Sequence, residues 1–460
     1  MVFSSLVFLY LYLPAVLVLH YVLPKKIRNA ALLLVNLVFY GYGEPVYVFL
    51  MIASIIVNYT MGAVLYRVKT KKLRLSVLVL NMLLNLGALG WYKYAGLFAD
   101  TLRHFTVFSD IPVLDIVLPI GISFYTFQAM SYVIDIYRKD TSPAENLIDF
   151  AAYISLFPQL IAGPIVRYSD VALQMKERYV TIEKFSWGIK MFCVGLAKKV
   201  LLANQFALLW HQVSANVQQM GTVWAWVAII GYSLQIYFDF GGYSDMARGL
   251  GAMLGFDFCI NFDYPYLSAS ITEFWRRWHI SLSSWFRDYV YIPLGGSRRG
   301  TLRTICNLII VWMLTGFWHG AGWNFLLWGF YYGALLIVEK FVLRTVLRKT
   351  PVLVKRLYAL VLVVIGWVFF ACPDLTSALD YLKVMFGAVS GQDLVQIFSW
   401  LPLLTVGILA STPAAALCCG KFKYRAFMPI LEAVFCLAAL VICTASLVSG
   451  SYNPFLYFRF

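Results

Sequence analysis

Two histidines in one aromatic-rich stretch are the residues of this sequence best suited to chemistry. His279 lies in the string EFWRRWHISLSSW and His319 in the string GFWHGAGWN, both within residues 268–333. Histidine is the side chain whose unperturbed pKa lies nearest neutrality. A neutral imidazole can take a proton from a hydroxyl as that hydroxyl attacks an acyl carbon, which accelerates the reaction by roughly 10²–10⁴-fold. We expect the catalytic centre in this stretch.

The other histidines are expected to be packing residues: His20, His104 and His211. His319 differs from them because it follows a tryptophan and lies among glycines, which let backbone and ligand approach closely. An ionisable residue inside a membrane domain is also costly to keep, so it is a functional candidate by default.

Other catalytic chemistries find little support. The sequence has no Gly-x-Ser-x-Gly nucleophile elbow, no Walker loop and no HExxH motif. Its eight cysteines form no Cys-x-x-Cys pair, and they indicate neither a disulfide framework nor a zinc site. Two distant histidines without cysteine partners make a weak zinc site, so we expect no metal.

The composition is typical of a helical protein that crosses a membrane many times. Of 460 residues, 61% are hydrophobic, whereas soluble domains are about 45–50% apolar. Apolar runs of the roughly 20 residues that a span needs recur along the whole chain. We therefore expect an all-α polytopic fold that forms a single membrane domain, residues 1–460.

The formal net charge of +15 follows the pattern of cytoplasmic loops and does not require a nucleic-acid partner. Basic residues fall in short clusters between apolar runs, as the positive-inside rule predicts, and such clusters also attract anionic lipids. The loops at 24–28 and 67–74 are basic, whereas the loop at 41–45 is not. If basic loops are cytoplasmic, the N-terminus faces outside.

Long helices are expected to surround the histidine stretch. Residues 271–291 are too rich in charge for a plain span, so they are expected to form amphipathic helices that lie at the interface or re-enter the membrane. A more polar helix is expected at 375–389. Spans are expected to end near residues 23, 40, 66 and 94, and to cover about 185–212, 222–251, 302–317, 322–342, 357–371, 397–417 and 427–448.

Two apolar segments contain helix-breaking residues. Leu118–Arg138 carries Pro119 and the polar Gln128, and Leu156–Tyr168 carries two prolines. Proline removes a backbone donor and breaks helices. Broken backbone at membrane depth is tolerated only where protein buries it or where it lines a watery cavity. The pair of segments predicts a cavity or channel, although either one alone is equally consistent with a kinked helix.

The string YFDFGGYSDMARG adds buried charge to a long helical stretch. Asp245 and Arg248 are three residues apart and can pair on one helix face. We favour such an ion pair as a packing device. The alternative is that Asp239 or Asp245 lines the reaction cavity.

Several long strings resemble the membrane-bound O-acyltransferase family, and within it the bacterial alginate O-acetyltransferase branch. The resemblance runs from Met1 to Phe460, and the teichoic-acid D-alanyl transferases are a sister branch. It implies a ring of roughly 11–13 transmembrane and re-entrant helices around a thin central core with a tunnel. The strings are PIGISFYTFQ, PQLIAGPIVRY, IYFDFGGYSDMARGLG, EFWRRWHISLSSWFRDYVYIPLGG, GFWHGAGWNFLLWG and the ending NPFLYFRF.

The resemblance also implies a reaction. Acetyl groups from cytoplasmic acetyl-CoA would cross the membrane for O-acetylation of an extracytoplasmic polysaccharide, with no bound cofactor. His319 would be the catalytic residue and His279 would assist it. Arginines are suited to the donor's phosphates because they bind phosphate bidentately, although Arg298 and Arg299 read more simply as positive-inside charge. The donor-site or tunnel candidates are Arg276, Arg277, Trp278, Arg287, Trp323, Asn324, Asp239, Asp245 and Gln128.

The same resemblance places the chain in the bacterial cytoplasmic membrane, surrounded by lipid, with an extracytoplasmic acetyltransferase as partner. Two other functions remain open. One is transfer of D-alanyl or another acyl group from a carrier-protein thioester to a cell-wall polymer. The other is a lipid or polymer transporter, because transporters also have broken helices and polar residues at the membrane midplane.

Overall fold

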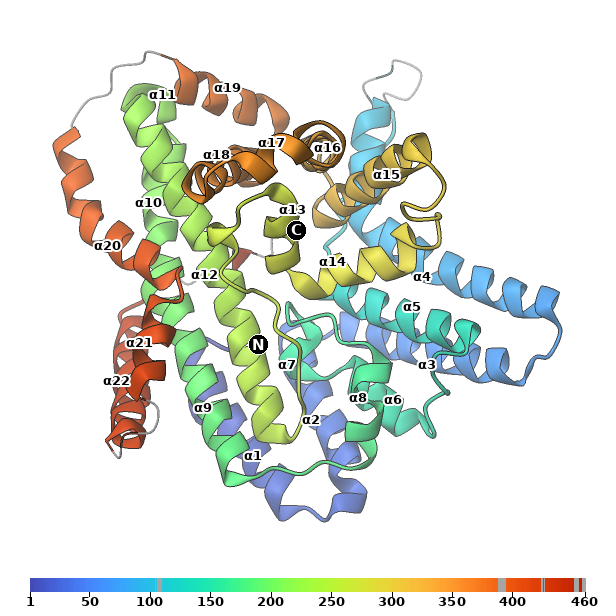
Figure 1. The fold of residues 1–460 in the computed structure, drawn as a ribbon. Helices are drawn as coiled ribbons and strands as arrows, with labels where there is room; N and C mark the ends of the chain where they lie inside the picture. Colours follow the sequence, from blue (N-terminus) through green and yellow to red (C-terminus); the bar gives the residue numbers. More distant parts are fainter. Residues whose placement is uncertain are drawn as a thin grey trace. The chain divides into compact units, whose positions relative to one another are not determined.

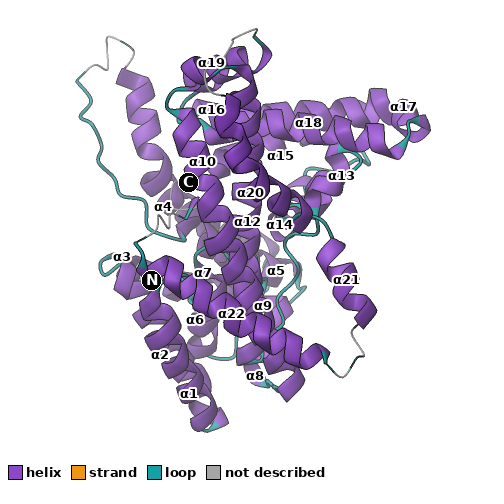
Figure 2. Cartoon of the chain, turned by 90° about the vertical axis from the view of Figure 1, so that its left-hand side faces the viewer, coloured by secondary structure: helices purple, strands orange, loops and turns teal. Residues whose placement is uncertain are grey.

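The computed structural model describes residues 1–103, 105, 110–387, 394–422, 425, 427–450 and 455–456. These residues form helices and connecting loops, and no strand occurs among them (Figure 2). Eight of the helices are long and apolar enough to cross a membrane, or nine if α20 (Ile397–Ala410) and α21 (Ala414–Phe422), bent by 61°, make one span. The expected all-α polytopic class is confirmed. The total of 11–13 is larger because it also counted shorter and re-entrant elements.

The chain divides into two compact units. The first consists of Met1–Phe192 and Met246–Cys259, and the second of Cys193–Asp245 and Ile260–Phe460. Two helices contribute residues to both units: α9 (Ile182–Ala197) and α12 (Thr222–Leu254). The other elements of the first unit are η1 (Phe8–Tyr12), α1 (Leu13–Val22), η2 (Lys25–Ile27), α2 (Arg28–Gly43), α3 (Tyr47–Arg67), α4 (Lys71–Arg103), α5 (Ile122–Arg138), α6 (Leu147–Ile154), α7 (Phe157–Leu160) and α8 (Tyr168–Lys176) (Figure 1).

The two proline-containing segments of the first unit behave differently. Helix α5 runs unbroken from Ile122 to Arg138 and packs against α3 and α4. Its proline, Pro119, precedes the helix, and Gly121 enters the helix with φ +77°, a conformation that glycine adopts without strain. The second segment is truly broken, because α7 has only four residues and the chain then continues without helix to Tyr168. Residues 156–166 are all buried, as broken backbone in an apolar setting requires.

A cluster of three asparagines joins α3 to α4. The Asn58 side-chain oxygen accepts hydrogen bonds from Asn81 at 2.9 Å and Asn85 at 3.0 Å, and the Asn58 amide donates to Asn85 at 3.1 Å. All three side chains are buried. Polar groups buried between apolar helices find hydrogen-bond partners only on those helices, so the cluster fixes the register of α3 against α4.

Replacement of Asn58 by alanine is therefore expected to lower the free energy of unfolding by about 1–2 kcal/mol, because it leaves two buried amides without their shared acceptor. Denaturant titration in detergent measures the change. Thr60→Ala, an exposed position on the same helix, is the matched control. Equal stability of the two variants would contradict this role of the cluster.

The second unit holds both histidines of interest. The charged stretch forms short helices, as expected: α13 (Ile271–Arg277), α14 (Ile280–Phe286) and the π-helical turn η6 (Arg287–Tyr291). None of them is long enough to span a membrane. Its elements are η4 (Lys198–Ala203), α10 (Asn204–Ser214), α11 (Val217–Met220), η5 (Pro265–Leu267), α13 (Ile271–Arg277), α14 (Ile280–Phe286), η6 (Arg287–Tyr291), α15 (Thr301–His319), α16 (Trp323–Val338), η7 (Glu339–Leu343), α17 (Arg344–Lys349), α18 (Val352–Ala371), α19 (Leu375–Phe386), η8 (Leu394–Gln396), α20 (Ile397–Ala410), α21 (Ala414–Phe422) and α22 (Met428–Val448).

Helices α15 and α16 form a hairpin whose two backbones meet at glycines. A Cβ atom at Gly316 would lie 2.3 Å from the backbone oxygen of Phe325, and one at Gly329 would lie 2.3 Å from the backbone oxygen of Trp312. Small residues at such positions let apolar helices approach closely. This glycine seam fixes the end of α15, where His319 is the last helical residue.

Candidate functional site

His319 lies within an aromatic enclosure. Its imidazole is 4% exposed, and three rings surround it with centroid distances of 4.9 Å to Trp318, 4.9 Å to Trp328 and 5.2 Å to Phe370. All three contacts are edge-to-face, the geometry that aromatic pairs prefer. The rings come from α15, α16 and α18, so three helices fix the position of this imidazole.

His279 lies at the junction between α13 and α14. Its backbone is left-handed, with φ +43° and ψ 55°, a conformation that non-glycine residues adopt rarely and that clusters at functional sites. The imidazole is 1% exposed and packs edge-on against Phe240 at 4.6 Å. Burial lowers the pKa of His279, which lies outside the long spans, to about 3, so the ring is neutral at physiological pH.

Both histidines line one cavity of about 720 Å³. The ring of Trp318 connects them, with its centroid 6.2 Å from that of His279 and 4.9 Å from that of His319. The structure thus brings together the two residues that the sequence singled out. Neutral imidazoles in an apolar aromatic setting can accept protons and orient a reacting group.

The same cavity has a strongly cationic lining. It includes six basic side chains and two carboxylates. One carboxylate, Glu339, accepts hydrogen bonds from the backbone N–H groups of Ile271 at 2.6 Å and Thr272 at 2.9 Å, so it fixes the start of α13. The basic lining residues are Arg276, Arg287, Lys340, Arg344, Arg348 and Lys355.

Four of these cations were missed in the sequence: Lys340, Arg344, Arg348 and Lys355. The signal was present, because Lys340, Arg344 and Arg348 are spaced four residues apart and therefore lie on one face of a helix. However, a cluster of basic residues at the end of a long apolar run is also typical of an ordinary cytoplasmic loop. The sequence alone therefore did not distinguish these residues from loop charge.

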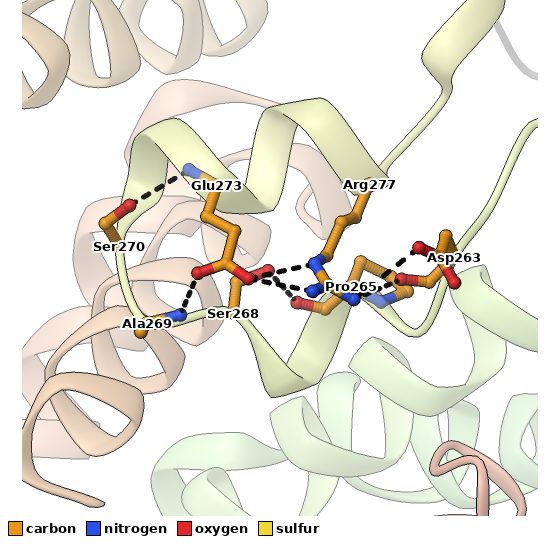
Figure 3. A network of polar contacts seen from close by, with 7 residues as sticks. All are labelled: Asp263, Pro265, Ser268, Ala269, Ser270, Glu273 and Arg277. Carbon is orange, nitrogen blue, oxygen red and sulfur yellow. Dashed lines mark hydrogen bonds and ion pairs between the residues drawn. The ribbon is translucent and has the colours of Figure 1, made fainter. Parts of the chain in front are cut away.

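The arginines predicted from the histidine stretch divide into two groups. Arg276 and Arg287 line the cavity, and Arg287 also forms an ion pair with Asp288 at 2.7 Å. Arg277 does not line the cavity. It binds Glu273 at 2.9 Å and Asp263 at 3.6 Å (Figure 3).

Figure 3 shows why Arg277 is held there. Ser270 caps α13 by accepting from the Glu273 N–H at 3.0 Å, and the Glu273 carboxylate accepts from the Ala269 N–H at 2.9 Å. This arrangement resembles a capping box. The same carboxylate also accepts a hydrogen bond from Arg277, one turn later, so Arg277 stabilises the loop and helix and is not itself a lining residue. Trp278 packs in the core, 4.8 Å from Trp367.

The two aspartates of α12 form ion pairs with consecutive lysines of η4. Lys199 lies 2.7 Å from Asp239, and Lys198 lies 2.6 Å from Asp245. Neither aspartate is among the residues that line the cavity that holds the histidines, so the structure gives no support to the alternative in which they face that cavity. The helices approach closely because a Cβ at Gly242 would lie 2.7 Å from the Gly195 backbone oxygen. The expected partner of Asp245, Arg248, lies over the Trp187 ring.

The remaining three candidates for the donor site or tunnel are not among the residues that line the cavity with the histidines. Asn324 is buried and donates to the backbone oxygens of Phe369 and Cys372, both at 3.1 Å, so it fixes the end of α18. Trp323 is 57% exposed at the start of α16. Gln128 is fully buried on α5 in the first unit.

The histidines expected to be packing residues differ from one another. His20 is buried, as expected. His211 is exposed and lines a second cavity of the second unit. His104 and most of the ending NPFLYFRF lie outside the described residues. Among the described residues, no three histidine, cysteine or carboxylate side chains gather into a group that could hold a metal.

The second cavity has a volume of about 740 Å³ and a different chemistry. It is lined mainly by amides, hydroxyls and aromatic rings, among them Gln235, Ser377, Trp210 and Tyr381, together with the carboxylate of Asp380, and its described lining residues include no lysine or arginine. Phe370, which contacts His319, also lines this second cavity. A single aromatic ring thus contacts His319 and also borders the second cavity.

Comparisons with known proteins all match the same protein family. The model of the membrane-bound O-acyltransferase family matches residues 52–379. The chain is 38% identical to the probable alginate O-acetylase AlgI of Azotobacter vinelandii over all of both chains. It is 43% identical to the protein of the same name from Pseudomonas aeruginosa, over 84% of this chain and 75% of that one. It is 32% identical to the peptidoglycan O-acetyltransferase of Helicobacter pylori, over 84% and 80%.

Proposed function

Because the chain belongs to the membrane-bound O-acyltransferase family, we propose that it is an O-acetyltransferase that moves acetyl groups from a cytoplasmic thioester to an extracytoplasmic polysaccharide. The family resemblance of the sequence is confirmed. The observation that carries the proposal is that His279 and His319 line the same cavity as six basic side chains. The relatives named for alginate and peptidoglycan O-acetylation support an acetyl group and a polysaccharide acceptor.

The proposed donor is acetyl-CoA, bound as a substrate rather than as a resident cofactor. It carries phosphates at one end and a thioester at the other. Arginine and lysine bind phosphates through charge-assisted hydrogen bonds, and the cavity presents Arg344, Arg348 and Lys355 for this purpose. Its volume of about 720 Å³ falls within the range of roughly 300–1,000 Å³ that is usual for ligand sites.

In the proposed reaction a hydroxyl oxygen attacks the thioester carbon. The new C–O bond forms, the C–S bond breaks, and the hydroxyl proton passes to an imidazole and then to the departing thiolate. Oxygen and sulfur thus exchange the acetyl group without oxidation or reduction. General-base assistance of this kind contributes roughly 10²–10⁴-fold. His319 is the proposed catalytic residue and His279 assists it.

The second cavity is the proposed approach for the acceptor. Its amides and hydroxyls suit a neutral hydroxyl-bearing molecule, and Trp210 and Tyr381 supply apolar faces. Phe370 lines this cavity and also contacts His319, so the acceptor hydroxyl is proposed to approach the imidazole beside that ring. One cavity is lined by six basic side chains, whereas the described lining of the other includes no lysine or arginine; this contrast supports two substrates that enter separately.

The protein crosses the membrane several times. We place it in the bacterial cytoplasmic membrane with its N-terminus outside, since its basic loops then face the cytoplasm. An exported acetyltransferase is the proposed partner that carries the acetyl group to the polymer. Recovery of no exported transferase with the tagged protein from native membranes would count against such a partner.

Acetyl-CoA labelled in its acetyl group tests the function directly. Proteoliposomes containing the wild-type protein are expected to release CoA and to retain the label on an added polysaccharide acceptor or on a partner. Release only from a carrier-protein thioester would replace acetyl-CoA by the carrier as donor. Movement of lipid or polymer across the vesicle without any acyl transfer would favour a transporter instead.

A further inference from the structure

Asn261 is a buried polar residue that contacts His279, at the α13–α14 junction, and the first two residues of α14. It lies in the loop after α12 and is 1% exposed. Its backbone oxygen accepts the N–H of Ile280 at 3.0 Å. Its side-chain oxygen accepts the N–H of Ser281 at 3.1 Å and the hydroxyl of Ser281 at 3.0 Å. The same oxygen lies 3.3 Å from Nδ1 of His279.

The orientation of the Asn261 amide follows from these contacts. The two side-chain atoms of an amide are distinguished only by their hydrogen bonds. A backbone N–H can only donate, so the atom facing Ser281 N must be the oxygen. That oxygen is therefore also the atom that faces His279.

The tautomer of His279 follows from the amide. An amide oxygen has no proton to give, so the Nδ1 of His279 must donate and must carry the proton. Burial keeps the ring neutral, since it lowers the pKa to about 3. A neutral imidazole has one protonated nitrogen, and the lone pair is therefore on Nε2.

We propose that Asn261 is a positioning residue that fixes the His279 tautomer with its proton on Nδ1, so that Nε2 keeps the lone pair with which His279 assists His319 in the histidine-lined cavity. The catalytic role of this tautomer rests on the proposed function, whereas the tautomer itself follows from the hydrogen bonds alone. Asn261 also binds both residues after His279, and so it holds the imidazole in the left-handed turn between two helices. A partner on one ring nitrogen generally decides which form the other takes.

The tautomer can be measured without any acyl transfer. The chain has five histidines, so a protein labelled with ¹⁵N-histidine and studied by solid-state NMR in bilayers gives few signals. Loss of a signal in His279→Gln identifies the residue. We expect a neutral ring protonated on Nδ1 in the wild type, and a mixture of tautomers in Asn261→Leu. A wild-type ring protonated on Nε2 would overturn the proposal, whatever the activity.

Kinetics then test the catalytic meaning. Asn261→Ala is expected to lower kcat about tenfold with little change in KM for acetyl-CoA. Asn261→Asp keeps an acceptor oxygen and adds negative charge, so it is expected to restore part of kcat and to shift the acidic limb of the pH–rate profile to higher pH, because the carboxylate favours the imidazolium.

Ser281→Ala is the matched control, since it removes one hydrogen bond of the same oxygen and leaves the histidine contact. An Asn261→Asp variant with an unshifted pH profile, or a kcat loss in Ser281→Ala equal to that in Asn261→Ala, would show a merely structural role. Failure of the wild type to release CoA would instead reject the proposed function, while the NMR result would still decide the tautomer.

Discussion

Replacement of His319 by alanine is expected to abolish release of CoA from acetyl-CoA while the protein remains folded in the membrane. The imidazole is buried at the end of α15 against three aromatic rings, and no other described histidine except His279 lines the same cavity. Loss of general-base assistance lowers kcat by roughly 10²–10⁴-fold. The measurement is thiol release by protein purified in detergent or reconstituted into liposomes.

The control for this prediction is His20→Ala. His20 is also a buried histidine, but it belongs to the first unit, so its loss is expected to leave kcat unchanged. The thermal midpoint of each variant shows whether it is folded. Turnover within tenfold of wild type in a folded His319→Ala protein would reject His319 as the catalytic residue.

Reversal of two charges on α17 is expected to weaken donor binding. In the variant with Arg344→Glu and Arg348→Glu, two cations of the cavity lining become anions. Hydrogen bonds to charged groups contribute about 1.5–3 kcal/mol each. KM for acetyl-CoA is therefore expected to rise about a hundredfold or more, whereas kcat at saturation changes little because the histidines are untouched.

A second pair of reversals separates contact from general charge. Lys349→Glu with Arg356→Glu changes the net charge equally at neighbouring exposed positions that do not line the cavity. It is expected to change KM only slightly, and less still at high salt, because exposed charges are screened. S-acetyl-pantetheine, which lacks the phosphates, should be used equally well by the wild type and by the Arg344 and Arg348 variant. An equal rise in KM for both double variants would contradict phosphate binding at α17.

The sequence revealed the membrane class and the pair of histidines because both leave local signals. Long apolar runs identify spans, and glycines and tryptophans around His319 distinguish it from an isolated packing histidine. The position of Arg277 also had a local signal, since Glu273 precedes it by one helical turn and such residues pair. Arg277 was predicted to bind the acyl donor because its positive charge was considered without the nearby carboxylate of Glu273.

Other parts of the site depend on contacts between distant segments. The ion pair of Lys198 with Asp245 joins residues 47 positions apart, and the Asn261–His279 contact joins residues 18 apart through a loop. Helix or strand periodicity does not predict contacts between residues so far apart in the sequence. Asn261 lies in a loop whose conformation no single-sequence pattern specifies, so its link to His279 required the structure.

The glycine seam between α15 and α16 has a consequence for mutational screens. A Cβ at Gly316 meets a backbone atom of Phe325 and not a flexible side chain, so no rotamer change can accommodate it. Gly316 carries no reactive group, yet a random library scored for activity alone would rank it beside His319. Measuring the amount of each variant in the membrane separates the two positions. A His319 variant loses activity while its abundance stays normal, whereas a Gly316 variant loses activity because the misfolded protein is depleted.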